Sequence, residues 1–136
     1  MHIAVRYHSR SGNTGKLAEA IGRAAGTEVM DVSVDLTEKT DILFLGSAVY
    51  GGDVDEAVRR FLKDNREKIG ILYNFSTAAV AGSTYKQISR IAEEYGIPMA
   101  KEEFHCRGNF LFLHKGHPNG EDLRKAEEFT KKVLLR

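Results

Sequence analysis

The sequence has few of the features that mark secreted, membrane or nucleic-acid-binding proteins. Its single cysteine excludes an internal disulfide and favours a reducing, cytoplasmic location. No apolar run approaches the roughly 18 residues of a membrane span, and the N-terminus lacks the charged-then-apolar layout of a signal peptide. The net charge of +1 argues against nucleic-acid or membrane-surface binding. We therefore expect a cytoplasmic protein without nucleic-acid or membrane partners.

Residues that commonly bind metals or act as nucleophiles are also sparse. The five histidines contain no H-x-x-x-H or H-E-x-x-H spacing, and one cysteine cannot build a zinc site. Cys106 has no C-x-x-C partner, which favours an inert structural thiol over a redox thiol. The sequence does not indicate a Ser-His-Asp arrangement. The sequence therefore predicts neither a metal site nor a set of catalytic residues.

Short apolar runs alternate with segments of helical periodicity along all 136 residues. Alternation of this kind predicts an α/β protein, a parallel sheet with helices on both faces, as one domain over residues 1–136. Five strands suit a flavodoxin-like three-layer sandwich with a five-stranded parallel sheet of order 2-1-3-4-5. The strand candidates are Ile3–Tyr7, Glu28–Ser33, Asp41–Ser47, Gly70–Ser76 and the region from Met99 to Leu113.

Sequence signals also place several helix ends. The first helix starts near Asn13, directly after the first strand and a polar turn, and the second begins near Asp53. Gly96 followed by Ile97-Pro98 predicts the end of the third helix. Asn119 is a candidate N-cap for the last helix, with acidic residues in its first turn.

The segment Ser9-Arg10-Ser11-Gly12-Asn13-Thr14 lies between the first strand and the first helix. A hydroxyl- and glycine-rich turn here directs backbone N–H groups toward an anion at the positive end of the helix. The segment does not match G-x4-G-K-[ST], because only two residues separate Gly12 from Gly15. A G-x-G-x-x-G fingerprint is also absent. The remaining alternatives are a phosphate-binding loop of another kind and a serine-rich turn with Asn13 as N-cap.

The spacing of this turn closely resembles the FMN-phosphate loop of flavodoxins, a [ST]-x-[ST]-G-x-T pattern. The resemblance implies that the hydroxyls of Ser9, Ser11 and Thr14, with the amides of residues 10–14, hold a phosphate dianion. Arg10 either adds a positive charge to the phosphate or faces solvent. The loop amides already supply enough donors, which favours the solvent orientation. His8 lies within the motif, and we assign no chemistry to it.

Two further segments are similar to flavin-contacting loops of the same family. The first is Gly46–Asp53, and the second follows the fourth strand from Asn74 to Ala79. The resemblance implies that Tyr50 covers one face of the flavin ring and that the Gly51-Gly52 backbone can flip toward the flavin. It also implies that backbone amides of the later segment line the pyrimidine edge. The implied cofactor-binding residues in these two segments are Ala48, Val49, Tyr50, Gly51, Gly52, Ser76, Thr77, Ala78 and Ala79.

The resemblance spans essentially the whole chain and is strongest to short-chain bacterial flavodoxins. It implies an FMN-binding electron carrier that shuttles one electron at a time between a reductase and an acceptor oxidoreductase, as a monomer. One alternative is an FMN-dependent NAD(P)H quinone or flavin reductase, although the chain has no spare segment for a nicotinamide site. A second is a flavin-free interaction module, since residues 77–82 lack the aromatic that many flavodoxins place over the outer ring face.

Overall fold

The structure, a computed structural model, describes residues 1–9, 12–48, 53–78, 82–107 and 118–135. Within these ranges strands and helices alternate along most of the chain, as the apolar pattern predicts, but residues 32–39 connect the second strand to the third without a helix. The described part contains no helix that combines the length and apolar character needed to cross a bilayer. The elements are β1 (Ile3–Tyr7), α1 (Asn13–Ala25), β2 (Val29–Asp31), β3 (Thr40–Ala48), α2 (Glu56–Asn65), the 3-10 helix η1 (Arg66–Lys68), β4 (Ile69–Ala78), α3 (Tyr85–Tyr95), β5 (Met99–Arg107) and α4 (Gly120–Leu134).

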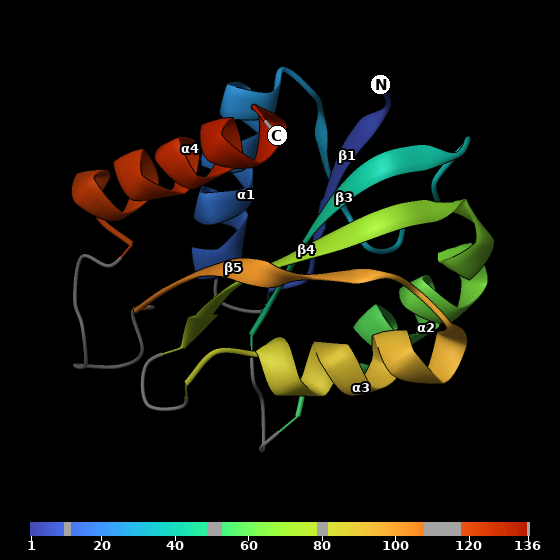
Figure 1. Ribbon diagram of the computed structural model, residues 1–136. Helices are drawn as coiled ribbons and strands as arrows, with labels where there is room; N and C mark the ends of the chain where they lie inside the picture. Colours follow the sequence, from blue (N-terminus) through green and yellow to red (C-terminus); the bar gives the residue numbers. More distant parts are fainter. Residues whose placement is uncertain (10–11, 49–52, 79–81, 108–117, 136) are drawn as a thin grey trace.

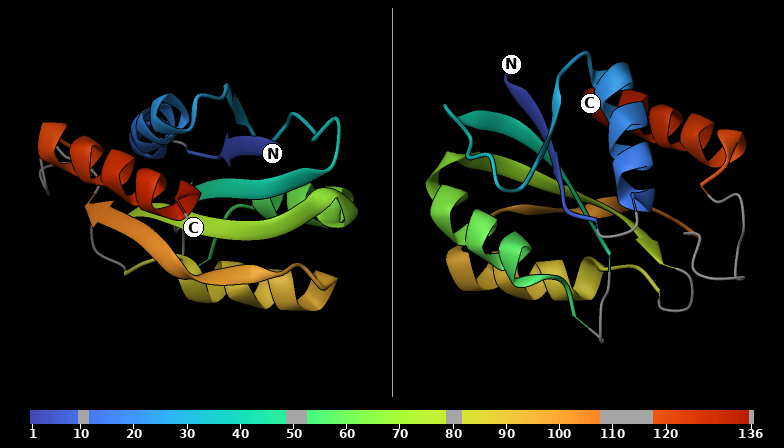
Figure 2. Two further views of the ribbon diagram at one scale, coloured as in Figure 1. Left: turned by 45° about the horizontal axis from the view of Figure 1, so that its top comes forward. Right: turned by 180° about the vertical axis from the view of Figure 1, so that it is seen from behind.

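The five strands form one parallel sheet in the order β2-β1-β3-β4-β5, which confirms the predicted order. Helices α1 and α4 cover one face of the sheet and α2 and α3 cover the other, giving three layers (Figures 1 and 2). In the register, Tyr7 lies opposite Gly46 and Gly46 lies opposite Phe75. The carboxyl ends of β1, β3 and β4 therefore meet at one edge, where ligands bind in folds of this kind.

An apolar cluster fills the space on each side of the sheet. On the α1/α4 side, Phe44 and Tyr73 of the sheet meet Phe129 of α4, each with ring centroids 6.4 Å from the Phe129 ring. On the other side, Leu43 and Leu45 pack toward α2 and α3. Both faces of β3 are buried because it lies at the centre of the sheet. This packing holds the strand ends at fixed positions.

Two predicted helix ends are confirmed and one start is wrong. Gly96 ends α3 with a left-handed φ of 70°, and Asn119 opens α4 in a capping box with Asp122. However, α2 begins at Glu56 and not near Asp53. The Asp55 carboxylate accepts a hydrogen bond from the Ala57 amide at 2.9 Å, so Asp55 is the N-cap and the helix follows it.

Four of the five predicted strands differ in their bounds. β3 and β4 extend one or two residues beyond the predicted Asp41–Ser47 and Gly70–Ser76 at each end. The second strand covers only Val29–Asp31 within the predicted Glu28–Ser33. The chain turns after Asp31, whose carboxylate accepts from the Ser33 amide and whose carbonyl accepts from the Val34 amide. The last strand runs over Met99–Arg107, and the remainder of the predicted region lies outside the described residues.

Candidate functional site

The predicted anion site includes the start of α1, directly after β1. Gly12 is the N-cap of α1 and has φ 85°, a left-handed conformation that glycine adopts without a side-chain clash. The Gly12 amide donates to Ser9 Oγ at 3.0 Å, which closes the turn. The N-cap residue itself offers no side-chain hydrogen bond to the helix, and the first turn of α1 contains no acidic residue. The positive end of the α1 dipole thus meets no carboxylate from its own first turn.

Thr14 links this turn to the end of β4. Its hydroxyl lies 2.9 Å from the Thr77 hydroxyl, and both side chains are buried. Gly46 makes the close approach possible, because a Cβ at that position would lie 2.2 Å from the Phe75 ring and 2.9 Å from Thr14 Cγ2. The first and third segments of the predicted site are therefore in direct contact.

A second polar cluster lies on the α3 side of the same edge, centred on Thr84. Thr84 Oγ1 lies 3.0 Å from Ser47 Oγ and 3.1 Å from Asn74 Nδ2, and all three residues are buried. The Thr84 amide points to Ser76 Oγ at 3.4 Å. Thr84 directs its hydroxyl to the strands and does not cap α3, which begins at the next residue. It thus anchors the entry to α3 on the ends of β3 and β4.

Strand β5 extends this cluster with two titratable side chains. Asn74 Nδ2 donates to Glu103 Oε1 at 3.2 Å, and Ser83 Oγ donates to the same carboxylate oxygen. Next to them, Ser76 Oγ and His105 Nδ1 are 3.0 Å apart. Buried polar groups are costly unless hydrogen-bonded, so a satisfied network of this kind fixes the relative positions of its members. The network holds the end of β4 and the residue Ser83, just before α3, against β5.

His8, the residue before the predicted phosphate loop, lies between two carboxylates. Its Nε2 atom is 3.3 Å from Asp55 Oδ2, and its Nδ1 atom is 3.9 Å from Asp31 Oδ2. The backbone amide of His8 donates to the Gly46 carbonyl at 3.0 Å, which extends the β1–β3 pairing beyond Tyr7. His8 therefore connects β1 with the end of β2 and with the start of α2.

The structure places several of the predicted cofactor-binding residues at one edge of the sheet. Ser9 and Gly12 form the turn after β1, while Asn13 and Thr14 open α1. Ala48 ends β3 directly opposite Thr77 of β4, with Ser76 before Thr77 and Ala78 after it. Seven predicted residues lie outside the described ranges: Arg10, Ser11, Val49, Tyr50, Gly51, Gly52 and Ala79.

Five polar residues of this edge were not among the predicted site residues: Ser47, Asn74, Thr84, Glu103 and His105. A signal for two of them was present in the sequence. Ser47 and Asn74 are polar residues within apolar strands, a combination that requires a hydrogen-bonding partner. The hydrogen-bond partners of Ser47 and Asn74 depend on the register of the sheet and on the position of Thr84 at its carboxyl edge.

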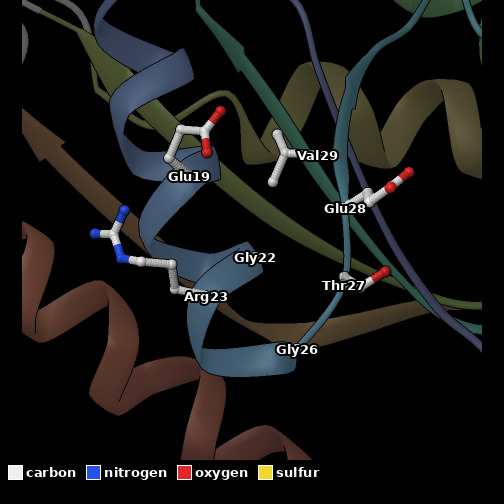
Figure 3. A pocket seen from close by; sticks show the side chains of 7 residues that line it. All are labelled: Glu19, Gly22, Arg23, Gly26, Thr27, Glu28 and Val29. Carbon is white, nitrogen blue, oxygen red and sulfur yellow. The ribbon is translucent and has the colours of Figure 1, made fainter.

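A surface depression lies at the opposite end of α1 and does not belong to this edge. Figure 3 shows Glu19 and Arg23 on α1 together with Thr27 and Glu28 before β2 and with Val29, the first residue of β2. It is shallow and carries both signs of charge. The buried polar clusters and the helix N-terminus, in contrast, lie at the carboxyl edge, so we place the candidate site there.

The surroundings of the single cysteine disfavour its reactive thiolate form. Cys106 is buried near the end of β5. Burial, with a smaller contribution from the Asp122 carboxylate, raises the pKa of the Cys106 thiol to about 12. Among the described residues, no group of three or more histidine, cysteine or acidic side chains is arranged to hold a metal ion.

The order of the sheet defines a doubly wound α/β protein, and Gly12 opens α1 directly after β1 at the point where the strand order reverses. The sequence model described as "Flavodoxin domain" matches residues 4–76, more than half of the chain. The chain therefore belongs to the flavodoxin family.

Individual proteins resemble this chain in sequence or in fold. An uncharacterized protein of Methanocaldococcus jannaschii, MJ0298, is 28% identical, and the match covers 90% of each chain. A solved flavodoxin from the domain Archaea superposes with a TM-score of 0.79 at 18% identity, covering 98% of this chain and 96% of the other. A flavoprotein from Lactobacillus acidophilus, solved in complex with FMN, superposes with a TM-score of 0.62 at 18% identity. The match covers 78% of this chain and 92% of the flavoprotein chain.

Proposed function

We propose that the protein binds FMN at the carboxyl edge of its sheet and carries electrons, one at a time, between redox proteins. The observation that carries this proposal is the turn from β1 to α1. A left-handed glycine opens α1 directly after the first strand, and the first turn of the helix contains no acidic side chain. A phosphate dianion is the ligand class that such a helix N-terminus favours.

The residues present fit the phosphate end of FMN. Amides of the first turn of α1, from Asn13 to Gly15, belong to the group of N–H donors that an α-helix leaves without an intrahelical acceptor. Ser9 Oγ lies at the same turn and holds the Gly12 amide. Lys16, exposed on the first turn of α1, adds positive charge near this end of the helix. The partial positive charges of these amides and the full positive charge of Lys16 all attract an anion.

The flavin ring would border the ends of β3 and β4, where Ala48 faces Thr77. The isoalloxazine supplies the electron chemistry when FMN is bound, and the protein supplies its binding and electrostatic surroundings. The buried bonds of Thr84 and Asn74 hold the entry to α3 and the end of β4 in place around it. The known FMN complex of the Lactobacillus acidophilus flavoprotein, which shares this fold, supports the choice of FMN.

We further propose that residues 1–136 act as one domain and as a monomer that exchanges electrons with a reductase and an acceptor oxidoreductase. The net charge of +1 implies little long-range steering. Association with these partners should therefore depend only weakly on salt, in contrast to strongly charged carriers.

Titration of the apoprotein with FMN and with riboflavin, which lacks the phosphate, tests the cofactor assignment. We expect one FMN per chain and binding at least about tenfold tighter than riboflavin, since hydrogen bonds to a charged group contribute about 1.5–3 kcal/mol each. Ser9→Ala should weaken FMN binding. The control Ser33→Ala, in the exposed turn after β2, should not. Equal affinity for FMN and riboflavin, or no uptake of either, would contradict the assignment.

Incubation of the FMN-loaded protein with NADH or NADPH tests the electron-carrier role against the reductase alternative. A carrier should leave the nicotinamide absorbance at 340 nm unchanged unless a separate reductase is added. Rapid direct oxidation of NADH by the protein alone would replace the carrier role with that of a reductase.

A further inference from the structure

Glu103 of β5 receives hydrogen bonds from both sides of the connection between β4 and α3. Asn74 Nδ2, in β4, donates to Glu103 Oε1 at 3.2 Å, and Ser83 Oγ, just before α3, donates to the same oxygen. The predicted cofactor-binding residues Ser76 and Thr77 lie between these two donors in the sequence. We call the contact Asn74–Glu103–Ser83 the Glu103 bridge. One half-buried carboxylate oxygen therefore holds the chain on either side of those residues.

An irregularity of the sheet brings Glu103 to this position. The register pairs Leu72 with Met99. It next pairs Asn74 with Glu103, so β5 uses two more residues than β4 over this interval. A regular continuation would place Lys101 opposite Asn74, on the same face of the strand as Glu103. The irregularity thus replaces an ammonium, which only donates hydrogen bonds, with a carboxylate, which only accepts them.

The carboxylate sets the direction of the hydrogen bonds around it. A hydroxyl has one hydrogen, so Ser83, which donates to Glu103, accepts through its oxygen from the Tyr85 amide at 2.9 Å. Tyr85 is the first residue of α3. The side-chain NH2 group of Asn74 faces both Glu103 and Thr84 Oγ1, which is 3.1 Å away. Because Asn74 is fully buried, removing the Glu103 acceptor leaves one of its N–H groups without that bond, at a cost in free energy.

We propose that Glu103 is a positioning residue for the flavin ring, and that it acts through Asn74 and Ser83. The proposal rests on the FMN site proposed above. Asn74 lies two residues before Ser76 on β4, whose end would border the ring. Ser83 holds the first amide of α3. Glu103 therefore fixes the end of β4 and the entry to α3 relative to β5.

The place of Glu103 in the sheet separates its effect from that of the phosphate turn. Strands β3 and β4 lie between β5 and β1, which leads into the phosphate turn. Loss of the Glu103 acceptor should therefore weaken the binding of FMN and of riboflavin by the same factor, because both contain the isoalloxazine ring. Ser9→Ala, in the phosphate turn, should instead lower the preference for FMN over riboflavin.

The test titrates wild type, Glu103→Leu and Glu103→Gln with FMN and with riboflavin. Leucine removes the acceptor, whereas glutamine keeps a side-chain oxygen that can accept both hydrogen bonds. We expect Glu103→Leu to bind each flavin about tenfold more weakly, and Glu103→Gln to stay within about threefold of wild type. The control Glu28→Leu removes an exposed carboxylate beside β2, at the other edge of the sheet, and should leave both affinities unchanged.

Two further measurements keep the proposal testable if Glu103→Leu does not fold. Ser83→Ala removes one of the two bonds and should weaken both flavins equally, by a smaller factor than Glu103→Leu. In the ¹⁵N-labelled apoprotein, the side-chain NH2 group of Asn74 reports the bridge without a flavin. Its hydrogens should exchange slowly in wild type and in Glu103→Gln, and faster in Ser83→Ala.

The outcomes distinguish a failure of the bridge from a failure of the cofactor assignment. If wild type binds neither flavin, the cofactor assignment fails, and the role of Glu103 at a flavin ring fails with it, although slow exchange at Asn74 would still confirm the bridge. If wild type binds FMN as expected, three results would each overturn the role of Glu103 alone. These are unchanged affinities in Glu103→Leu, a loss confined to FMN, and a loss in Glu103→Gln as large as that in Glu103→Leu.

Discussion

Replacement of Thr14 and Thr77 by valine tests whether the phosphate turn and the end of β4 are energetically coupled. The two hydroxyls are 2.9 Å apart, with Thr14 fully buried and Thr77 2% exposed. Valine has nearly the shape of threonine, so either single change removes the bond without opening a cavity. It leaves the partner hydroxyl buried without that bond, which costs about 1–3 kcal/mol. The double variant removes both hydroxyls and leaves no such orphan.

We therefore expect each single variant to lose about 1–3 kcal/mol of unfolding free energy, and the double variant to lose clearly less than the sum. Urea denaturation of the apoprotein gives these values, provided that the slopes of the transitions remain equal. Thr130 is a matched control, because its buried hydroxyl donates to the Ala126 carbonyl within α4. Thr14→Val and Thr130→Val should be additive. Additivity of the Thr14 and Thr77 changes would refute the coupling.

Three further results are expected. Gly46→Ala should destabilise the protein by at least about 1–3 kcal/mol in urea melts, because its Cβ would lie 2.2 Å from the Phe75 ring; unchanged stability would contradict the close packing. Asn119→Ala removes the capping box of α4 and should lower the unfolding free energy by about 1 kcal/mol in the same assay. Unchanged stability would contradict a stabilising role for this cap. Burial raises the pKa of the Cys106 thiol from 9.0 to about 12. Below pH 9 its reactive thiolate is therefore about a thousandfold scarcer than that of an ordinary cysteine. Ellman's reagent at pH 8 should label Cys106 only after unfolding.

The sheet could be predicted from the sequence because each strand has a local signal. Ile3–Tyr7 matches the observed β1 at both ends, since a polar turn and a helix-period segment follow it. Gly96 and Asn119 act through contacts with residues three or four positions away, so the local sequence contains the partners of both. Asp55 has the same kind of local bond to Ala57, but Asp53 offers the same side chain two residues earlier. Local pattern does not choose between the two caps.

The polar clusters could not be predicted because their contacts join distant parts of the chain. The hydroxyls of Thr14 and Thr77 are 63 positions apart, and Asn74 and Glu103 are 29 apart. An irregularity in the β4–β5 register between Leu72 and Asn74 sets which side chain of β5 faces Asn74. A one-residue change of register would present the opposite face of the strand. The sequence marks such residues as polar, but only the fold assigns their partners.

Amide chemical shifts of the ¹⁵N-labelled apoprotein during titration with FMN test most directly where the phosphate binds. We predict the largest changes in the first turn of α1, at Asn13, Thr14 and Gly15, with smaller changes for inorganic phosphate at the same amides. No comparable change should occur at the depression near Gly22 and Val29 at the other end of α1. Shifts confined to that depression, or absent from the first turn of α1, would contradict the phosphate site.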